Sequence, residues 1–541
     1  MAQSNLSQTQ EQRDEALLQR FGYRQELRRT LGFLSNFAVA FSYISVSTGT
    51  FTLFALGLAA GGPAFFWTWP IVAAGQFLVA LNFAELASHF PIAGSIYQWS
   101  KRLSGYTLGW FTGWVYFFAG ALTVTAVAFT VPIPLFGIFP GIPASILGVR
   151  SDVFIALVAI VVCTLINIAG VRLVSIINNI GVAAEILGMF VFALVLLIFA
   201  NHNSLGFLFS TPTPATQAIQ TPGSPWTPGF GTTYFGAFLA ALFMSLFVIY
   251  GFDTAGTLGE ETRDPQKNAP RGVLWAIGLS AIAGLLFLGG TLLSIHKLGD
   301  IEAIATGANG TQALPTIIKQ GLGDFWGSVY LGVVFVAVFV CTLAIQSATI
   351  RLMFSMGRDG RLPFGKVWGA VNPTFRTPLW AGVAVGVLAA IPFALQLAFP
   401  SASVIYVIVA AATGLIYVSY FMNNIASLMA RLKGWPREKA PFSLGRWGVL
   451  INVLALVYGG VMIINFLWFG GLRDTFLINP YLSTAFTGLA NVPLLGRLPI
   501  FETFLILLFG TGAIYWFGFK RRSVIAIAGA GTEKPAEALA D

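Results

Sequence analysis

At residues 42–51 the chain reads Ser-Tyr-Ile-Ser-Val-Ser-Thr-Gly-Thr-Phe, a polar run inside an apolar segment that extends from residue 31 to residue 60. The segment is long enough to cross a bilayer, but the run is rich in poor helix formers. A membrane helix that unwinds at mid-depth exposes backbone N–H and C=O groups, which is tolerated only where they face protein, water or a ligand. A second interruption follows at residues 250–256. Two broken helices in a many-spanning protein indicate a substrate site at mid-membrane.

The composition supports this reading. Of 541 residues, 56% are hydrophobic and only 9% are charged, and the mean hydropathy is +0.78. A soluble globular protein of this size is excluded, so the sequence predicts an all-α, polytopic membrane protein. The two cysteines, Cys163 and Cys341, both fall within predicted spans. They suit neither a disulfide framework nor a metal site, and we expect small, buried core residues.

Apolar segments of roughly 20 residues mark the expected transmembrane spans. Twelve such segments are predicted, at about residues 32–60, 63–87, 107–132, 152–170, 180–200, 233–259, 272–294, 326–350, 378–398, 402–424, 447–470 and 499–519. They form one membrane domain, residues 31–519, in which spans 1–5 (about 31–200) and spans 6–10 (about 233–424) can be inverted repeats. Spans 11 and 12 (about 447–519) are then additional helices.

The distribution of Lys and Arg gives the expected orientation. With both termini in the cytoplasm, 25 of the 30 Lys and Arg residues fall on the cytoplasmic side, as the positive-inside rule requires. The net charge of +9 is therefore expected to meet the cytoplasmic leaflet of the lipid bilayer and not nucleic acid. Residues 1–30 form a cytoplasmic segment with an amphipathic helix from Glu11 to Arg29, and residues 520–541 form a cytoplasmic tail.

The two breaks supply the candidate substrate-binding residues. Half-helix N-termini present N–H groups suited to a carboxylate, and freed carbonyls suit an ammonium group. The alternative is that these small residues only allow close helix packing. The candidates are Ser45, Ser47, Thr48, Gly49, Thr50, Tyr250, Gly251, Phe252, Asp253 and Thr254.

Charged residues inside or at the ends of spans are the other candidates. Glu185 is a candidate proton carrier or partner for a substrate ammonium, with an interfacial carboxylate as the alternative. Asp253 lies in the second break, where a helix N-cap is the alternative role. The remaining four, Glu85, Glu260, Glu261 and Arg351, are expected to form a cytoplasmic gate of ion pairs.

Enzyme motifs are not found. The sequence has no phosphate-binding loop of the form Gly-x-x-x-x-Gly-Lys-Ser/Thr, no Cys/His cluster and no nucleophile–base pair. No catalytic residue, cofactor or metal is expected, and an ion or substrate gradient is the expected source of energy.

Four stretches resemble the amino acid/polyamine/organocation (APC) superfamily of transporters. They are Ser47-Thr-Gly49, then Phe83-Ala-Glu-Leu with Phe90-Pro-Ile-Ala-Gly94, then Gly251-Phe-Asp-Thr-Ala with Gly259-Glu-Glu261, and the run from Arg351 to Pro363. The opening Phe21-Gly-Tyr-Arg-Gln-Glu-Leu-Arg-Arg29 is most similar to the amino acid/choline transporter branch, which includes γ-aminobutyrate (GABA) permeases. This resemblance implies twelve transmembrane helices in the LeuT-type fold, with two inverted five-helix repeats. Glu185 occupies a position where some proton-coupled members have a lysine, so that lysine mechanism does not carry over.

The sequence therefore predicts a secondary active transporter of an inner membrane. It would move an amino acid or related amine, GABA-like or neutral, by alternating access with proton coupling. The substrate carboxylate would meet N–H groups around Ser47, Thr48 and Gly49, and the amino group would meet carbonyls near Ser45 and Tyr250, with Phe252 as a gate. The alternatives are a choline or polyamine carrier or an amino acid exchanger and, from another class, a channel or a substrate-sensing receptor. The oligomeric state is left open.

Overall fold

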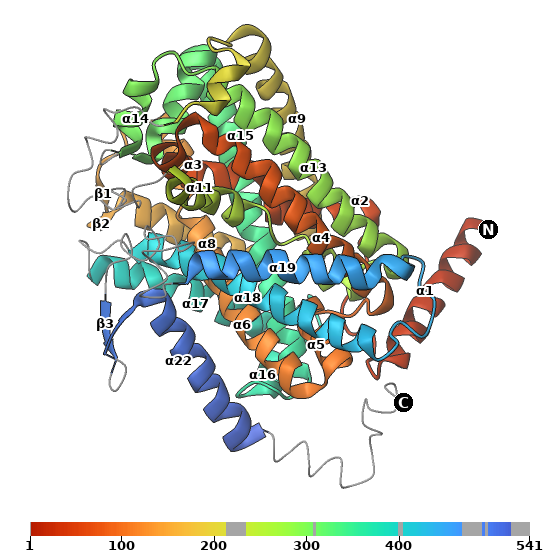
Figure 1. Ribbon diagram of the computed structural model, residues 1–541. Coiled ribbons are helices and arrows are strands. Elements are labelled where there is room, and N and C mark those ends of the chain that lie inside the picture. The colour runs from red at the N-terminus through yellow and green to blue at the C-terminus, as the bar shows by residue number, and fades with distance from the viewer. Residues whose placement is uncertain are drawn as a thin grey trace.

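The computed structural model describes residues 2–211, 234–306, 310–398, 404–467, 489–492 and 496–520, and these form a bundle of long helices (Figure 1). Two short antiparallel hairpins are the sheets in this part of the chain. One pairs β1 (Ser145–Ile146) with β2 (Val149–Arg150), and the other pairs β3 (Leu489–Val492) with β4 (Gly496–Pro499). The predicted all-α class is confirmed.

Ten helical stretches in the described residues are long and apolar enough to cross a membrane. The first holds two crossings: α2 (Phe33–Ile44) continues into α3 (Val46–Gly61), and α4 (Thr68–His89) follows a 3-10 turn at Gly62–Trp67. The short α11 (Tyr234–Val248) and α12 (Thr254–Thr257) supply another. The twelve crossings expected from the sequence are therefore all represented by helices.

The other crossings are α6 (Tyr106–Ala128), α8 (Ser151–Ala169), α9 (Val171–Phe199), α13 (Pro265–Leu293), α15 (Ala313–Arg358), α17 (Leu379–Ala398), α18 (Val404–Leu432), α19 (Gly448–Phe466) and α22 (Ile500–Tyr515). Shorter helices connect or flank them: α1 (Ala2–Arg20), α5 (Ser95–Ser104), α7 (Pro132–Ile138), α14 (Leu298–Thr306) and α16 (Gly365–Trp368).

Helix pairing in the bundle follows an inverted repeat. Crossings 1 and 6 pack together through α3 and α11, 2 and 7 through α4 and α13, 3 and 8 through α6 and α15, and 4 and 9 through α8 and α17. Each of the first four crossings thus contacts its counterpart in the second repeat. This pairing agrees with the LeuT-type fold, in which the substrate site lies at the interface of the two repeats. The two additional helices lie outside it: α19 packs on α4 and α18, and α22 lies at the edge of the bundle (Figure 1).

The first break is confined to one residue. Ser45 has φ 30° and ψ 91°, so α2 ends before it and α3 begins after it. The polar run around it stays helical, and its hydroxyls are satisfied within the helix: Thr50 Oγ1 donates to the Val46 carbonyl at 2.7 Å, and Thr52 Oγ1 donates to the Thr48 carbonyl at 2.8 Å. The break is therefore narrower than the polar stretch that predicts it.

The second break is longer. Helix α11 ends at Val248, the backbone passes through Gly251 at φ 90°, and helix resumes at Thr254 for one turn only. Asp253 precedes that turn, but its side chain makes no capping hydrogen bond. The alternative role of Asp253 as a helix N-cap is therefore not observed.

The helix predicted from Glu11 to Arg29 ends earlier in the structure, because α1 stops at Arg20. The prediction of helix beyond this point is wrong because Gly22 takes the left-handed conformation, φ 82°, which terminates helices. The chain then runs on to Leu31, where the backbone N–H donates to the Glu261 carbonyl at 2.9 Å. Hydrogen bonds to a distant segment thus replace the helical ones.

We predict that Gly251→Ala abolishes transport. A Cβ at Gly251 would lie 1.9 Å from Cδ1 of Tyr43, and a positive φ is strained for alanine. We expect a loss of about 2 kcal/mol or more in stability, from overpacking plus strain. Thermal unfolding of the purified protein and uptake into proteoliposomes measure the two effects. Gly278→Ala is the control, because a Cβ there meets no heavy atom within 4 Å. Normal uptake by Gly251→Ala would contradict the assigned close packing.

Candidate functional site

The first break is tied to Glu185 of α9. Ser45 Oγ and Ser47 Oγ both donate to Glu185 Oε1, at 2.8 and 2.7 Å. Ser45 Oγ also accepts the Thr48 backbone N–H at 3.4 Å, which caps α3. The Glu185 residue is only 2% exposed, so its alternative role as an interfacial carboxylate is excluded. One carboxylate oxygen and two hydroxyls thus hold the break to the neighbouring helix.

Neither carboxylate of the two breaks has a cationic partner within the described residues. The ion pairs formed there include neither Glu185 nor Asp253. A buried carboxylate held only by hydroxyl groups can exchange a proton without breaking a salt bridge. Ionisable groups placed in this way inside a membrane protein are typical of proton relays and substrate pathways.

Asp253 fastens the second break to three other helices. Its carboxylate accepts hydrogen bonds from Tyr420 of α18 at 2.6 Å, Tyr116 of α6 at 2.7 Å and Ser95 of α5 at 2.9 Å. The Tyr420 hydroxyl in turn accepts the Gly251 backbone N–H at 2.8 Å. An N–H group that the break removes from the helix is therefore satisfied by a side chain.

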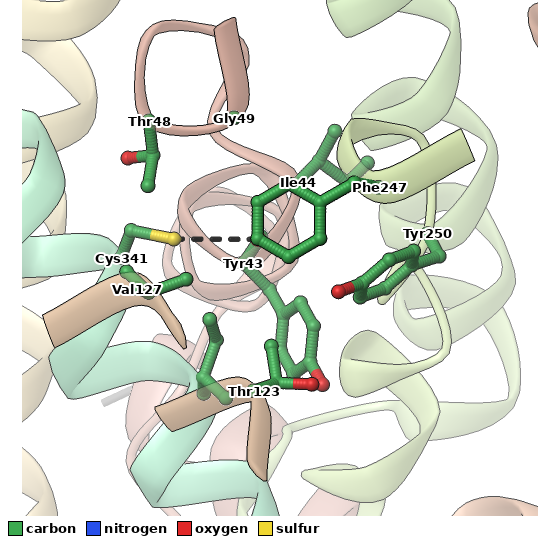
Figure 2. Close-up of a pocket in the computed structure, with 10 residues that line it drawn as sticks. Tyr43, Ile44, Thr48, Gly49, Thr123, Val127, Phe247, Tyr250 and Cys341 are labelled. Carbon is green, nitrogen blue, oxygen red and sulfur yellow. Dashed lines mark hydrogen bonds between the residues drawn. The ribbon is translucent and has the colours of Figure 1, made fainter. Parts of the chain in front are cut away.

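A small cavity lies between the two breaks (Figure 2). Its volume is about 10 Å³, which is room for about one water molecule. The aromatic rings of Tyr43 and Tyr250 meet edge to face on its wall, with centroids 6.2 Å apart. The cavity is therefore too small for an organic ligand unless its lining side chains move. The lining residues are Tyr43, Ile44, Thr48, Gly49, Thr123, Val127, Phe247, Tyr250, Cys341 and Ile345.

Three of the predicted substrate-binding residues, Thr48, Gly49 and Tyr250, line this cavity. The predicted gate Phe252 does not line it, and packs instead on Phe83 and Tyr420 with ring centroids 5.9 and 5.5 Å apart. The remaining candidates do not line the cavity and make their contacts elsewhere around the two breaks. Ser45 and Ser47 bind Glu185, Thr50 bonds within its own helix, Gly251 and Asp253 bind Tyr420, and Thr254 is buried.

Several residues of the site are not predicted from the sequence. Tyr43, Tyr116 and Tyr420 are aromatic residues in apolar spans, where core packing is the default interpretation. Cys341 is buried, as expected, but its thiol also donates to the Tyr43 carbonyl at 3.5 Å (Figure 2). A hydroxyl or thiol at mid-span is the available signal, and it is shared by many core residues of this chain.

An ion-pair network closes one end of the bundle; we call it the Arg351 network. Arg351 Nε lies 2.8 Å from Glu261 Oε1, and Arg358 Nη2 lies 2.7 Å from Glu260 Oε1. The 3-10 turn Gly259–Glu261, which follows α12, is thereby bound to the end of α15. Three of the four predicted gate residues thus meet here.

The fourth predicted gate residue, Glu85, forms a separate pair in the same region. It binds Arg431 of α18, and it also accepts from the Ser443 hydroxyl at 2.9 Å. This pair ties the end of α4 to α18, so it fixes helices that surround the broken ones.

Tyr23, Lys101 and Asp359 extend the Arg351 network to the N-terminal segment. Lys101 Nζ lies 2.5 Å from Asp359 Oδ2, and the Tyr23 hydroxyl donates to Asp359 Oδ1 at 2.8 Å. Burial by itself raises the pKa of Asp359, but the charge of Lys101 and the hydrogen bonds outweigh burial and lower that pKa. The lowered pKa favours the ionised form of Asp359, whereas burial lowers the pKa of Lys101 against the opposing charge of Asp359.

We predict that Tyr420→Phe impairs transport more than Tyr116→Phe does. The first change leaves the Gly251 N–H without its acceptor and removes one donor to Asp253, whereas the second removes one donor only. Each buried polar group left unpaired costs about 1–3 kcal/mol. Uptake rates and unfolding midpoints of both variants provide the comparison, and equal effects would argue against the shared role of the Tyr420 hydroxyl.

We also predict that Lys101→Met destabilises the protein by about 3–5 kcal/mol, because Asp359 is left as a buried charge without its lysine. Lys101→Met/Asp359→Asn should recover part of this loss. In the single variant burial now raises the pKa of the carboxyl group, so the penalty is largest at neutral pH and shrinks as the pH falls toward about 4. Unfolding curves in detergent at several pH values test this, and a pH-independent penalty would contradict it.

A family model described as amino acid permease matches residues 31–487. The amino-acid permease BAT1 of Arabidopsis thaliana is 31% identical over 470 residues, which are 82% of this chain and 86% of the relative. Its homolog from Oryza sativa is 29% identical over 473 residues, 83% and 87% of the two chains. The GABA-specific permease of Saccharomyces cerevisiae is 25% identical over 394 residues, 68% and 64% of the two chains. The chain therefore belongs to the amino acid permease family of the APC superfamily.

Proposed function

We propose that this permease is a secondary active transporter that carries an amino acid or a related amine by alternating access, with the proton as coupling ion. The observation that carries the proposal is the bonding of Glu185 to Ser45 and Ser47 at the first break. The same break provides Thr48 and Gly49 to the cavity wall. A proton site and a substrate site thus share one turn of helix.

Coupling would act through the Ser45 hydroxyl. This oxygen donates to Glu185 and accepts from the Thr48 backbone N–H, so the carboxylate and the start of α3 together fix its orientation. Protonation of Glu185 weakens the hydrogen bond that it accepts, because charge-assisted hydrogen bonds are the stronger ones. The first turn of α3 would then move, and with it the groups that meet the substrate. Protonation of Glu185 would therefore alter the substrate site directly, because both sites share the first turn of α3.

A zwitterionic substrate fits this site better than a choline or polyamine cation does. Glu185 and Asp253 are not among the residues that line the cavity, and hydroxyl groups already hold both. The cavity wall instead has the start of α3, where N–H groups suit a carboxylate. The Tyr250 hydroxyl, which makes no hydrogen bond to any other described residue, can serve the amino group. The substrate of the yeast relative, as its name gives it, is GABA, which has both groups.

The Arg351 network would be the cytoplasmic gate. It lies at the end of the bundle that the Lys and Arg distribution favours as cytoplasmic. Both termini would then be cytoplasmic, and the membrane would be an inner membrane. Opening toward the cytoplasm would require Glu261 to leave Arg351 and Glu260 to leave Arg358. Such buried pairs are costly to separate singly, which favours an all-or-none opening.

Glu185→Gln tests the coupling. Glutamine keeps a side-chain oxygen that accepts from Ser45 and Ser47 but cannot carry a proton. We expect the variant to bind substrate and to exchange it across proteoliposomes, but to lose accumulation driven by an imposed pH gradient. The measurements are radiolabelled uptake with and without the gradient, and counterflow. Accumulation equal to the wild type would refute the role of Glu185.

Two further measurements secure this test. Glu185→Leu removes both acceptor and proton and should lose exchange as well, which separates proton carriage from support of the break. A thermal-shift screen of amino acids and amines identifies the substrate, because a ligand that binds the folded state raises its unfolding midpoint. Choline or a polyamine as the sole stabilising ligand would favour the rival carrier, and flux without saturation would favour a channel.

A further inference from the structure

Two histidines lie side by side at the end of the bundle opposite the Arg351 network. His202 follows α9 and His296 follows α13, and the centroids of their rings are 3.7 Å apart with an angle of 42° between the ring planes. Both residues are exposed. They are separated by more than ninety positions in the sequence, so the fold and not local spacing brings them together.

The segment with His202 is fastened to the segment that leads to His296. The backbone N–H groups of His202 and Asn203 donate to the Leu293 carbonyl at 2.9 and 3.2 Å. Asn203 Nδ2 donates to the carbonyls of Leu293 and Ile295, at 3.1 and 2.6 Å. Four hydrogen bonds thus fix the backbone beside both rings and keep the two imidazoles close. Ring centroids 3.7 Å apart are in contact, so each ring must turn about its side-chain bonds before both can direct a nitrogen at one ion.

We propose that His202 and His296 form a site for a divalent transition-metal ion such as Zn²⁺. Neutral imidazole is the most common protein ligand for such ions. Among the described residues no group of three or more His, Cys, Asp or Glu side chains is placed to hold a metal ion. The pair therefore supplies two ligands, and water completes the coordination. A two-histidine site of this kind is open and exchangeable, and it differs from a closed structural zinc site.

A metal ion at this site would clamp α9 to α13. The two helices pack closely near these ends, because a Cβ at Gly290 of α13 would lie 2.9 Å from the Ala193 carbonyl of α9. Helix α9 also contains Glu185. An ion that holds the ends of α9 and α13 together would oppose any transport step that separates them, so the site is inhibitory. This second consequence rests on the proposed transport function, whereas the binding itself does not.

Binding is tested first, on purified protein with an affinity tag that contains no histidine. Isothermal titration with ZnCl₂ should show one ion bound per chain, and zinc should raise the unfolding midpoint. His202→Gln and His296→Gln should each lose the binding and the zinc-dependent shift, while their midpoints without zinc stay at the wild-type value. His89→Gln is the matched control, because His89 is the only other histidine in the chain and both its ring nitrogens already face backbone carbonyls.

Transport is tested second, with ZnCl₂ added outside the proteoliposomes. Wild-type uptake should fall, and uptake by the two variants should resist zinc with unchanged basal rates. Zinc binding that persists in the variant His202→Gln/His296→Gln, or no binding to the wild type, would overturn the site. Binding without inhibition would overturn the clamp. If no substrate is transported at all, the proposed function fails while the titration still decides the metal site.

Discussion

The site depends on two hydrogen bonds of the Ser45 hydroxyl, one to the Glu185 carboxylate and one from the Thr48 backbone N–H. A backbone that leaves the helix inside a bilayer must find partners for the groups that it exposes. Here one oxygen caps α3 and also donates to Glu185 of α9. The break at Ser45 and the buried Glu185 carboxylate therefore stabilise one another. Protonation of the Glu185 carboxylate and the geometry of the break at Ser45 are thus expected to change together.

The second break satisfies the same constraint with a different set of groups. Tyr420 stands between the Gly251 N–H and the Asp253 carboxylate, and it comes from α18, the tenth crossing. The first break is bound by α9, the fifth crossing. In each repeat, then, the last helix holds the broken helix: α9 holds the first break by a carboxylate, and α18 holds the second by a phenol. The two halves thus share a plan. In the first half the last helix contributes an acid, Glu185, to the break, whereas in the second half the last helix contributes Tyr420.

The twelve spans, the two breaks and the meeting of Glu260, Glu261 and Arg351 could be predicted from the sequence, because apolar length, mid-span polar residues and charges at span ends are local signals. The partners could not. Glu85 meets Arg431 across 346 positions, and Tyr43 and Tyr116 have no feature that separates them from ordinary core aromatics. The N-terminal helix was overestimated because the charge pattern continues past Gly22, whereas the backbone conformation changes there. Local sequence therefore predicts the helices and the breaks well, but it does not predict which distant side chains form ion pairs and hydrogen bonds with them.

The N-terminal segment bonds to residues that follow much later in the chain, which determines when these contacts can form during protein synthesis. Tyr23 emerges early from the ribosome, but its acceptor Asp359 follows 336 residues later, and the partner of Arg20, Glu438, follows 418 residues later. At usual rates of about 5–20 residues per second, the segment waits tens of seconds for these partners. The end of the bundle that it seals is therefore completed late in translation, so a nascent chain passes through a stage in which its helices are inserted but this end is still open.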